Sequence, residues 1–242
     1  MDQLILNNEE KFLQGKLEGY SLEEAENKFD TEGKPLYFPG CTIICKILEN
    51  SDLFNELSLV QSKYKDFNPN NAYTYIPPSS FHMTLFDCCN INTVNTTFWP
   101  RSIKTKNNYK EIALELNHKI KDFIFPEKFK LKLNFFFGGY CLALEGATEK
   151  DEKNLRYCRN SLSELLGIKF LNHETYSFHI TLAYILRELN EKEVKNLLSM
   201  NKQLYRVMPL VPLLLASMVE QTACQLGKFR KILLDYFFAL SF

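Results

Sequence analysis

One short pattern occurs twice in the sequence and constrains the fold more than any other feature. The first copy is Phe-His-Met-Thr-Leu at 81–85, and the second is Phe-His-Ile-Thr-Leu at 178–182. Both copies set a polar His-x-Thr pair among aromatic and aliphatic residues, which is typical of a strand. Side chains two apart on a strand point to the same face. Each copy therefore presents one imidazole beside one hydroxyl.

The spacing of the two copies indicates an internal duplication. The two histidines are 97 residues apart, and so are the two threonines. With the same offset, the apolar stretch at 42–48 falls on the stretch at 139–145. Each of these stretches is followed by a polar, helix-forming segment. We therefore predict two halves with approximate two-fold symmetry, which brings the two His-x-Thr pairs face to face.

The composition is that of an ordinary globular protein. The chain has 242 residues, 45% of them hydrophobic and 24% charged, and its formal net charge is zero. This balance gives no general attraction to a membrane or to a long nucleic-acid duplex, so any anion site must be local. The longest apolar run, at 207–219, is too short to span a bilayer, which takes about 20 residues. We expect a monomer with no membrane partner.

The cysteines follow no recognisable metal-binding or disulfide pattern. There are seven, and their spacing resembles neither a zinc ribbon nor a set of disulfides. The polar start of the sequence shows no secretory signal, so we expect a cytoplasmic location with reduced thiols.

The apolar periodicity divides the chain into regular elements. Residues 1–38 are expected to form an N-terminal extension that packs on the domain. Residues 39–242 are expected to form one bilobal domain, with halves at about 39–137 and 139–242. The expected helices lie at 51–65, 109–124, 149–166 and 189–201, and the expected strands at 42–48, 80–87, 130–137, 140–144, 177–185 and 210–217.

Residues 90–110 interrupt this pattern with a long excursion. The segment holds the only tryptophan, Trp99, and a basic cluster that includes Arg101, Lys104 and Lys106, with no acidic residue. Long loops of this kind are usually functional or disordered. One hypothesis is that the indole stacks on a base while the cations meet phosphates. The alternative is a solvated loop pinned by one tryptophan.

Three other residues near the motifs or of the same type need an interpretation. Tyr184, five residues after His179, is a candidate substrate-binding residue, although strict alternation puts it on the opposite face of the strand. The remaining histidines, His118 and His173, occur in no repeated context, and we interpret them as ordinary surface or turn residues.

Two facing histidines suit general acid–base catalysis. The unperturbed imidazole pKa of about 6.5 makes both the neutral and the charged form available near neutral pH. The threonine hydroxyls can donate to the non-bridging oxygens of a phosphate. A single His-x-Thr pair is most often structural, but two copies with the same neighbours favour catalysis. Since no metal-ligand motif or carboxylate cluster lies beside either pair, we predict phosphodiester chemistry without a metal or other cofactor.

At the two His-x-Thr motifs the sequence resembles the two-histidine (2H) phosphoesterase superfamily. That group includes the LigT-like RNA 2',3'-cyclic phosphodiesterases, also called 2'-5' RNA ligases, and the plant and yeast cyclic phosphodiesterases. Further stretches resemble one branch of it, catalogued as a domain of unknown function: residues 28–30, 38–42, 77–84 and 99–100.

The resemblance implies a bilobal α+β fold, with antiparallel sheets that line a central cleft and helices outside. It implies an active site made by His82, Thr84, His179 and Thr181. The implied reaction opens a 2',3'-cyclic phosphate or cleaves a 2'-5' linkage, on a small nucleotide or a short single-stranded RNA. Which histidine is the acid and which is the base stays open at this point.

Two other classes of function stay open. One alternative is a catalytically silent nucleotide- or RNA-binding module, in which the same site has kept its shape but lost turnover. The other is a metalloprotein, in which His82 and His179 bind a metal together with nearby cysteines.

Overall fold

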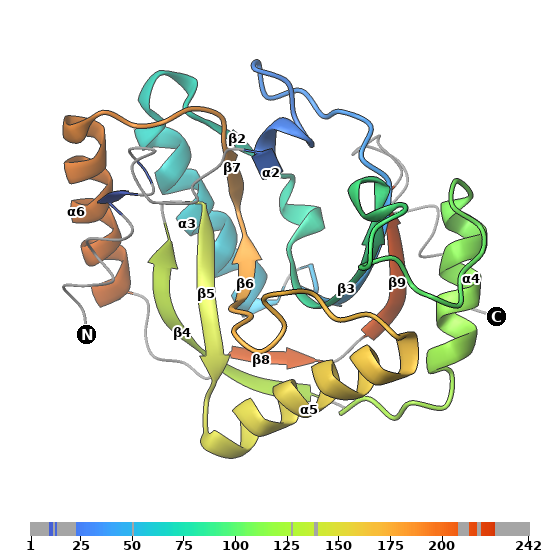
Figure 1. Ribbon diagram of the computed structural model, residues 1–242. Helices are drawn as coiled ribbons and strands as arrows, with labels where there is room; N and C mark the ends of the chain where they lie inside the picture. The colour runs from blue at the N-terminus through green and yellow to red at the C-terminus, as the bar shows by residue number, and fades with distance from the viewer. Residues whose placement is uncertain are drawn as a thin grey trace.

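The protein is built on one twisted antiparallel sheet with helices packed around it (Figure 1). The computed structural model describes residues 10–11, 13, 23–49, 51–126, 128–137, 140–207, 213–216 and 219–225. Within these residues the main sheet has seven strands in the order β8-β4-β5-β6-β3-β1-β9. Its strands are β1 (Gly40–Lys46), β3 (His82–Asn90), β4 (Lys128–Phe137), β5 (Cys141–Gly146), β6 (Phe178–Thr181), β8 (Leu213–Ala216) and β9 (Val219–Gln225).

A second, smaller sheet and a set of helices complete the described part. The small sheet pairs β2 (Tyr73–Tyr75) with β7 (Ala183–Ile185). The helices are α2 (Glu23–Glu26), α3 (Asp52–Phe67), α4 (Tyr109–Ile120), α5 (Glu149–Leu166) and α6 (Glu191–Val207). Short 3-10 turns lie at η1 (Pro69–Asn71), η2 (Pro78–Ser80) and η3 (Ile91–Thr93). Among the described residues, no helix combines the length and the apolar character that crossing a membrane requires.

Local sequence explains where the long helices begin and end. The hydroxyl of Ser51 accepts a hydrogen bond from the Phe54 N–H at the start of α3. Thr148 and Asp151 form a reciprocal capping box at the start of α5. That helix ends at Gly167, whose left-handed conformation (φ 66°) stops the helical ladder.

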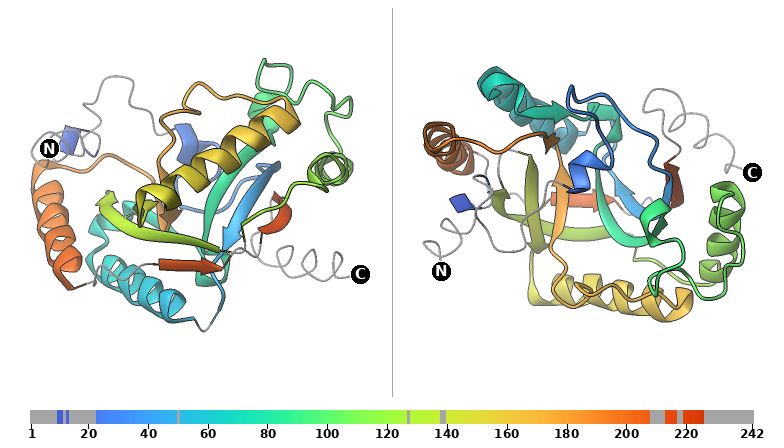
Figure 2. Two further views of the ribbon diagram at one scale, coloured as in Figure 1. Left: turned by 90° about the horizontal axis from the view of Figure 1, so that it is seen from below. Right: turned by 45° about the horizontal axis from the view of Figure 1, so that its top comes forward.

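Helices α3 and α5 cover the same face of the sheet. From α3, the ring of Phe54 packs against Phe81 with centroids 6.1 Å apart. From α5, the guanidinium carbon of Arg156 lies 4.9 Å from the centroid of the Phe178 ring. Phe81 and Phe178 directly precede the two repeated histidines, so alternation turns the histidines to the other face. Figure 2 shows α3 and α5 in two further views, with α5 crossing below β5 and β6 in the right-hand one.

The predicted α+β class is confirmed, with antiparallel pairing throughout the described strands. The sheet differs from the expected arrangement in one respect, because it runs continuously through both halves instead of forming a separate sheet in each. The join is the β3–β6 pair, which carries the two repeated motifs. The predicted strand at 177–185 is divided in two, since β6 ends at Thr181 and β7 begins at Ala183. The domain boundaries stay a prediction.

The two halves follow the same local plan on either side of this join. One half runs β1, α3 and β3, and the other runs β5, α5 and β6. The pairing register also repeats: His82 lies opposite Lys46, and His179 lies opposite Ala143. Lys46 and Ala143 are separated by 97 residues, the offset found between the motifs. A common origin for the halves stays an interpretation.

The segment before β1 is folded onto the small sheet. Residues 28–36 form a short turn, which we call the 28–36 hairpin, closed by a bridge between Phe29 and Pro35. Thr74 of β2 donates its hydroxyl hydrogen to the Gly33 carbonyl oxygen at 2.9 Å. Gly33 has φ 77°, and a Cβ there would lie 2.8 Å from the Thr74 side chain. Glycine therefore allows both the turn and its close approach to β2.

A second close approach lies where β5 meets the start of α5. A Cβ on Gly146 would lie 2.2 Å from the Glu152 backbone nitrogen and 2.6 Å from its Cα. We expect Gly146→Ala to lower the free energy of unfolding by about 1–3 kcal/mol, because strand and helix must move apart. Urea unfolding followed by circular dichroism measures the loss. Ala147→Ser adds one atom at a partly exposed neighbour and is the control. Equal stability of the two variants contradicts the prediction.

Candidate active site

The two repeated motifs meet at the middle of the sheet. β3 pairs with β6 antiparallel, with Met83 opposite Ile180. Both of these side chains are fully buried, whereas their neighbours on each strand are partly exposed. Residues flanking a matched antiparallel pair oppose one another, so each histidine lies across from the threonine of the other motif. The resulting set, which we call the His-Thr array, consists of His82, Thr84, His179 and Thr181.

Each imidazole is held by a backbone carbonyl two residues earlier. His82 Nδ1 lies 2.7 Å from the Ser80 carbonyl oxygen, and His179 Nδ1 lies 2.9 Å from that of Ser177. A carbonyl oxygen only accepts hydrogen bonds, so Nδ1 carries the proton in both rings. Nε2 is therefore the nitrogen that each ring offers to a substrate. The repeat thus includes the serine before each motif, which the sequence comparison missed.

His82 is placed where the charged form is disfavoured. Burial lowers the pKa of His82 below its ordinary value, and the positive charges of His179 and Lys28 lower it further. The hydrogen bond to the Ser80 carbonyl acts in the other direction, because it favours the protonated ring. With its pKa lowered, His82 is neutral near pH 7, the form in which it can accept a proton.

A β-bulge interrupts the strand that carries His179. The N–H groups of Leu182 and Ala183 both donate to the Tyr140 carbonyl oxygen, at 2.6 and 3.2 Å. Two residues then oppose one, which shifts the alternation of side chains by one position. Leu182 and Ala183 are both buried, and Tyr184 is partly exposed. The expectation that Tyr184 lies off the histidine face therefore fails, since it assumed a regular strand.

A buried glutamine ties together the segments that flank the array. Gln61 of α3 is 1% exposed, and its Nε2 donates to the carbonyl oxygens of Ile76 and Leu182, both at 2.8 Å. Ile76 precedes the turn that leads to His82, and Leu182 follows the second motif. The role of Gln61 could not be predicted, because one glutamine on a helix forms no recognisable pattern.

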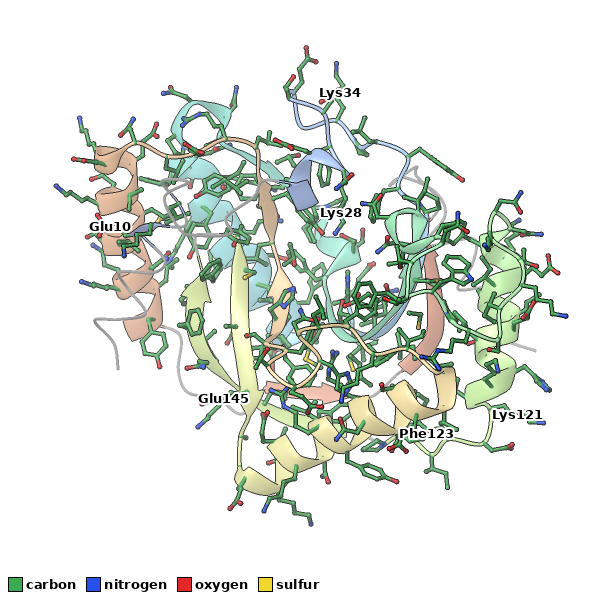
Figure 3. The ribbon with its side chains drawn as sticks, in the orientation of Figure 1. Glu10, Lys28, Lys34, Lys121, Phe123 and Glu145 are labelled. Atoms are coloured by element: carbon green, nitrogen blue, oxygen red, sulfur yellow. The ribbon has the colours of Figure 1, made fainter. Side chains whose placement is uncertain are left out.

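A lysine outside the motifs lies beside the array. Lys28 Nζ donates to the Tyr184 hydroxyl at 3.3 Å and lies 4.9 Å from the centroid of that ring. Figure 3 shows Lys28 next to α2, between β7 and β3 in this view. The positive charge of Lys28 contributes to the lowered pKa of His82. Lys28 falls in the stretch at 28–30 that resembles the superfamily branch, but no role was predicted for it.

The tryptophan in the excursion after β3 is buried, which differs from the role predicted for it. Trp99 is 7% exposed and belongs to the hydrophobic core, and its Nε1–H donates to the Ile103 carbonyl oxygen at 3.0 Å. An indole enclosed in this way does not offer a face to a base, so the stacking hypothesis for Trp99 is wrong. Arg101 and Lys104 are exposed on this segment, which runs beside α4 in Figure 1. Their contact with substrate stays a prediction.

The two remaining histidines lie away from the array. His118 is exposed on α4, as expected. His173 lies in a turn, also as expected, but it is only 3% exposed. Its Nε2 lies 2.8 Å from Asn160 Oδ1, and its ring packs edge-on against Phe86. Burial lowers the pKa of His173, so a neutral, structural ring fits this site.

The described cysteines behave as small buried side chains. All those whose side chains the structure describes are buried and free of disulfides. Burial raises the pKa of Cys45 to about 12, which keeps that thiol protonated. Within the described residues, no three histidine, cysteine or acidic side chains gather at metal-binding positions. The metalloprotein hypothesis therefore has no ligand set in this part of the chain.

A groove of about 530 Å³ lies at the start of α5 and reaches Tyr176 and Ser177, just before the second motif. Its charged lining is largely paired: Lys132 bonds Glu145 at 3.0 Å, and Arg156 bonds Glu152 at 2.8 Å. The groove therefore offers little excess positive charge to a phosphate. The array remains the better candidate for phosphodiester chemistry.

A family model matches the first part of the chain. Residues 28–137 match the model 2H-phosphodiest, described as "Domain of unknown function (DUF1868)". The matched segment includes the first His-x-Thr pair and ends before the second. It begins inside the predicted N-terminal extension, so the 28–36 hairpin belongs to the matched domain.

A solved structure has a similar fold. The crystal structure of a conserved protein of unknown function from Agrobacterium tumefaciens, ATU0111, matches with a TM-score of 0.70 and 22% sequence identity. The match covers 74% of this chain and 77% of that chain. Identity at this level shows the fold alone. A search of curated proteins found no match.

Proposed function

Because the chain belongs to the 2H phosphoesterase superfamily, we propose that it hydrolyses a phosphodiester by metal-independent acid–base catalysis at the His-Thr array. The proposed substrate is a 2',3'-cyclic phosphate or a 2'-5' linkage, at an RNA end or in a small nucleotide. Membership of the superfamily indicates phosphodiesterase activity in general, and the array supports this particular chemistry.

The observation that carries the proposal is the matched geometry of the two imidazoles. Both rings hold the proton on Nδ1 against a backbone carbonyl, so both present Nε2 on the same side. Both sit on adjacent, directly paired strands with a threonine across from each. A purely structural pair of histidines does not need equivalent tautomers and equivalent hydroxyl neighbours.

In the proposed reaction His82 is the general base. Its Nε2 takes a proton from water as the water oxygen bonds to phosphorus. The bond from phosphorus to the 2' or 3' oxygen breaks. His179, which enters the step with protons on both ring nitrogens, gives its Nε2 proton to that leaving oxygen. Exchange with solvent then restores both rings. The lowered pKa of His82 supports this assignment, because the base must be neutral before attack.

The two threonines act on the phosphate. Their hydroxyls donate to the non-bridging oxygens, where negative charge builds up as water adds. Thr84 and Thr181 come from different strands and flank the reacting phosphorus in this arrangement. Tyr184, Arg101 and Lys104 are proposed to contact the remainder of the nucleotide.

Hydrolysis of a mixed substrate panel in EDTA tests the proposal. The panel contains the four nucleoside 2',3'-cyclic phosphates, an RNA ending in a 2',3'-cyclic phosphate, 2'-5' oligoadenylate and ADP-ribose 1'',2''-cyclic phosphate. We expect turnover of at least one member, unaffected by EDTA and absent from the His82→Ala, His179→Ala double variant. Equal product from wild type and the double variant contradicts the proposal. Binding of a panel member without turnover favours a silent binding module.

A further inference from the structure

Several independent contacts fix the position of the Lys28 side chain. Its Nζ donates to the Tyr184 hydroxyl, and the same ammonium lies 5.6 Å from the centroid of the Phe38 ring. The Tyr184 ring is in turn backed by Phe29, with centroids 5.0 Å apart. The ammonium is thus held between aromatic side chains, an environment that lowers the freedom of a lysine and keeps its charge in one place.

The backbone of Lys28 is also fixed. Its N–H donates to the Ala25 carbonyl oxygen, and its carbonyl oxygen accepts from the Leu36 N–H. The 28–36 hairpin is anchored to β2 through Thr74 and Gly33. Thr74 pairs directly with Tyr184 across the small sheet. The lysine and its tyrosine partner are therefore carried by elements that are bonded to each other.

The bulge after the second motif connects this pair to the array. It puts Tyr184 in phase with the partly exposed His179, so the hydroxyl that holds Lys28 lies on the reactive side of the strand. The array itself contains imidazoles and hydroxyls but no permanent positive charge. A phosphodiester carries one negative charge, which a fixed ammonium can meet.

We propose that Lys28 is a substrate-contacting residue that binds the phosphodiester anion, and that Tyr184 and the 28–36 hairpin hold it in position. This inference rests on the proposed function of the array. It adds a cation, supplied from outside both repeats, to a site that is otherwise symmetric. Such a cation makes the two histidines unequal, because the described element that precedes β5 is the strand β4 and not a hairpin like 28–36.

The same cation affects how His82 titrates. Several groups lie around this imidazole: His179 and Thr181 from β6, Lys46 from β1, and Lys28 from the hairpin. Tyr184 of β7 acts through Lys28, whose Nζ it binds. The positive charge of Lys28 lowers the pKa of His82, in the same direction as burial. Removing that charge is therefore expected to raise the pH at which His82 loses its proton.

Lys28→Met tests the inference, with Lys34→Met as the matched control. Lys34 lies on the same hairpin, is exposed and pairs with Glu32, so its removal deletes an equal charge without touching the array. We expect Lys28→Met to lower kcat/KM roughly 10- to 100-fold, as for the loss of a charged hydrogen bond. Lys28→Arg keeps the charge and is expected to retain more activity. Lys34→Met is expected to match wild type.

A measurement that needs no turnover separates this inference from the proposed function. The imidazole resonances of His82 are followed by NMR as pH is changed and as inorganic phosphate is added. We expect Lys28→Met to raise the pKa of His82 and to weaken phosphate binding, with both unchanged in Lys34→Met. Identical titrations in Lys28→Met and wild type overturn the inference. An inactive wild type that still binds phosphate through Lys28 overturns the proposed function alone.

Discussion

Replacing either array histidine is expected to lower kcat by about 10²- to 10⁴-fold, the range typical of general acid–base catalysis. His82→Ala removes the group that accepts the proton of water. His179→Ala removes the group that protonates the leaving oxygen. Each ring is hydrogen-bonded only through Nδ1 to a nearby carbonyl, so alanine leaves the strand pairing in place. Initial rates on an active panel substrate, with circular dichroism to check folding, measure the loss.

The histidine prediction has a direct control. His118→Ala removes an exposed imidazole from α4 and is expected to leave kcat unchanged. The double variant is expected to have a kcat only slightly below that of the less active single variant. The two rings act in one step, so their effects on kcat do not add. Full turnover by either His82→Ala or His179→Ala means that its ring takes no part in the reaction.

Removing one hydroxyl from the array is expected to lower kcat by roughly 10²- to 10³-fold, as for loss of one oxyanion donor. Thr84→Val and Thr181→Val keep the shape of the side chain and its preference for a strand. Any decrease in kcat is then due to the missing hydroxyl. Both positions are partly exposed, so the fold does not depend on filling them. Steady-state kinetics of the two variants give kcat and KM separately.

Serine replacements complete the threonine experiment. Thr84→Ser and Thr181→Ser keep the donor and are expected to retain most of the activity. Thr42→Val, at a partly exposed threonine on β1, is the control for removing a hydroxyl elsewhere on the sheet. If valine and serine variants have the same kcat, the hydroxyls do not stabilise charge on the phosphate.

Local patterns predicted most of the regular elements. The periodic segments at 51–65, 109–124 and 149–166 correspond to α3, α4 and α5, with ends that differ by a few residues. Their caps and apolar spacing lie within the segment itself, which is why they could be read from sequence. The continuous sheet was not predicted, because the pairing of β3 with β6 joins residues almost a hundred positions apart.

The reactive residues were easier to predict than the groups that position them. The residues of the His-Thr array were predicted from a repeated motif, which can be recognised in the sequence alone. The bulge at Leu182 depends on a shared carbonyl from Tyr140, and Gln61 acts by bridging two distant loops. Neither arrangement has a local pattern. Trp99 was wrongly placed because a lone tryptophan in a polar loop reads as exposed until its core contacts are known.

The most direct test of the account is the pH dependence of kcat/KM for an active panel substrate in EDTA. We predict a bell-shaped profile, with one limb from a base that must be neutral and one from an acid that must be protonated. The pKa of His82 is lowered, so activity is lost as pH falls through a value below the ordinary 6.5 or so. His82→Ala is expected to remove that limb. A profile that stays flat between about pH 5 and 9 contradicts two-histidine catalysis.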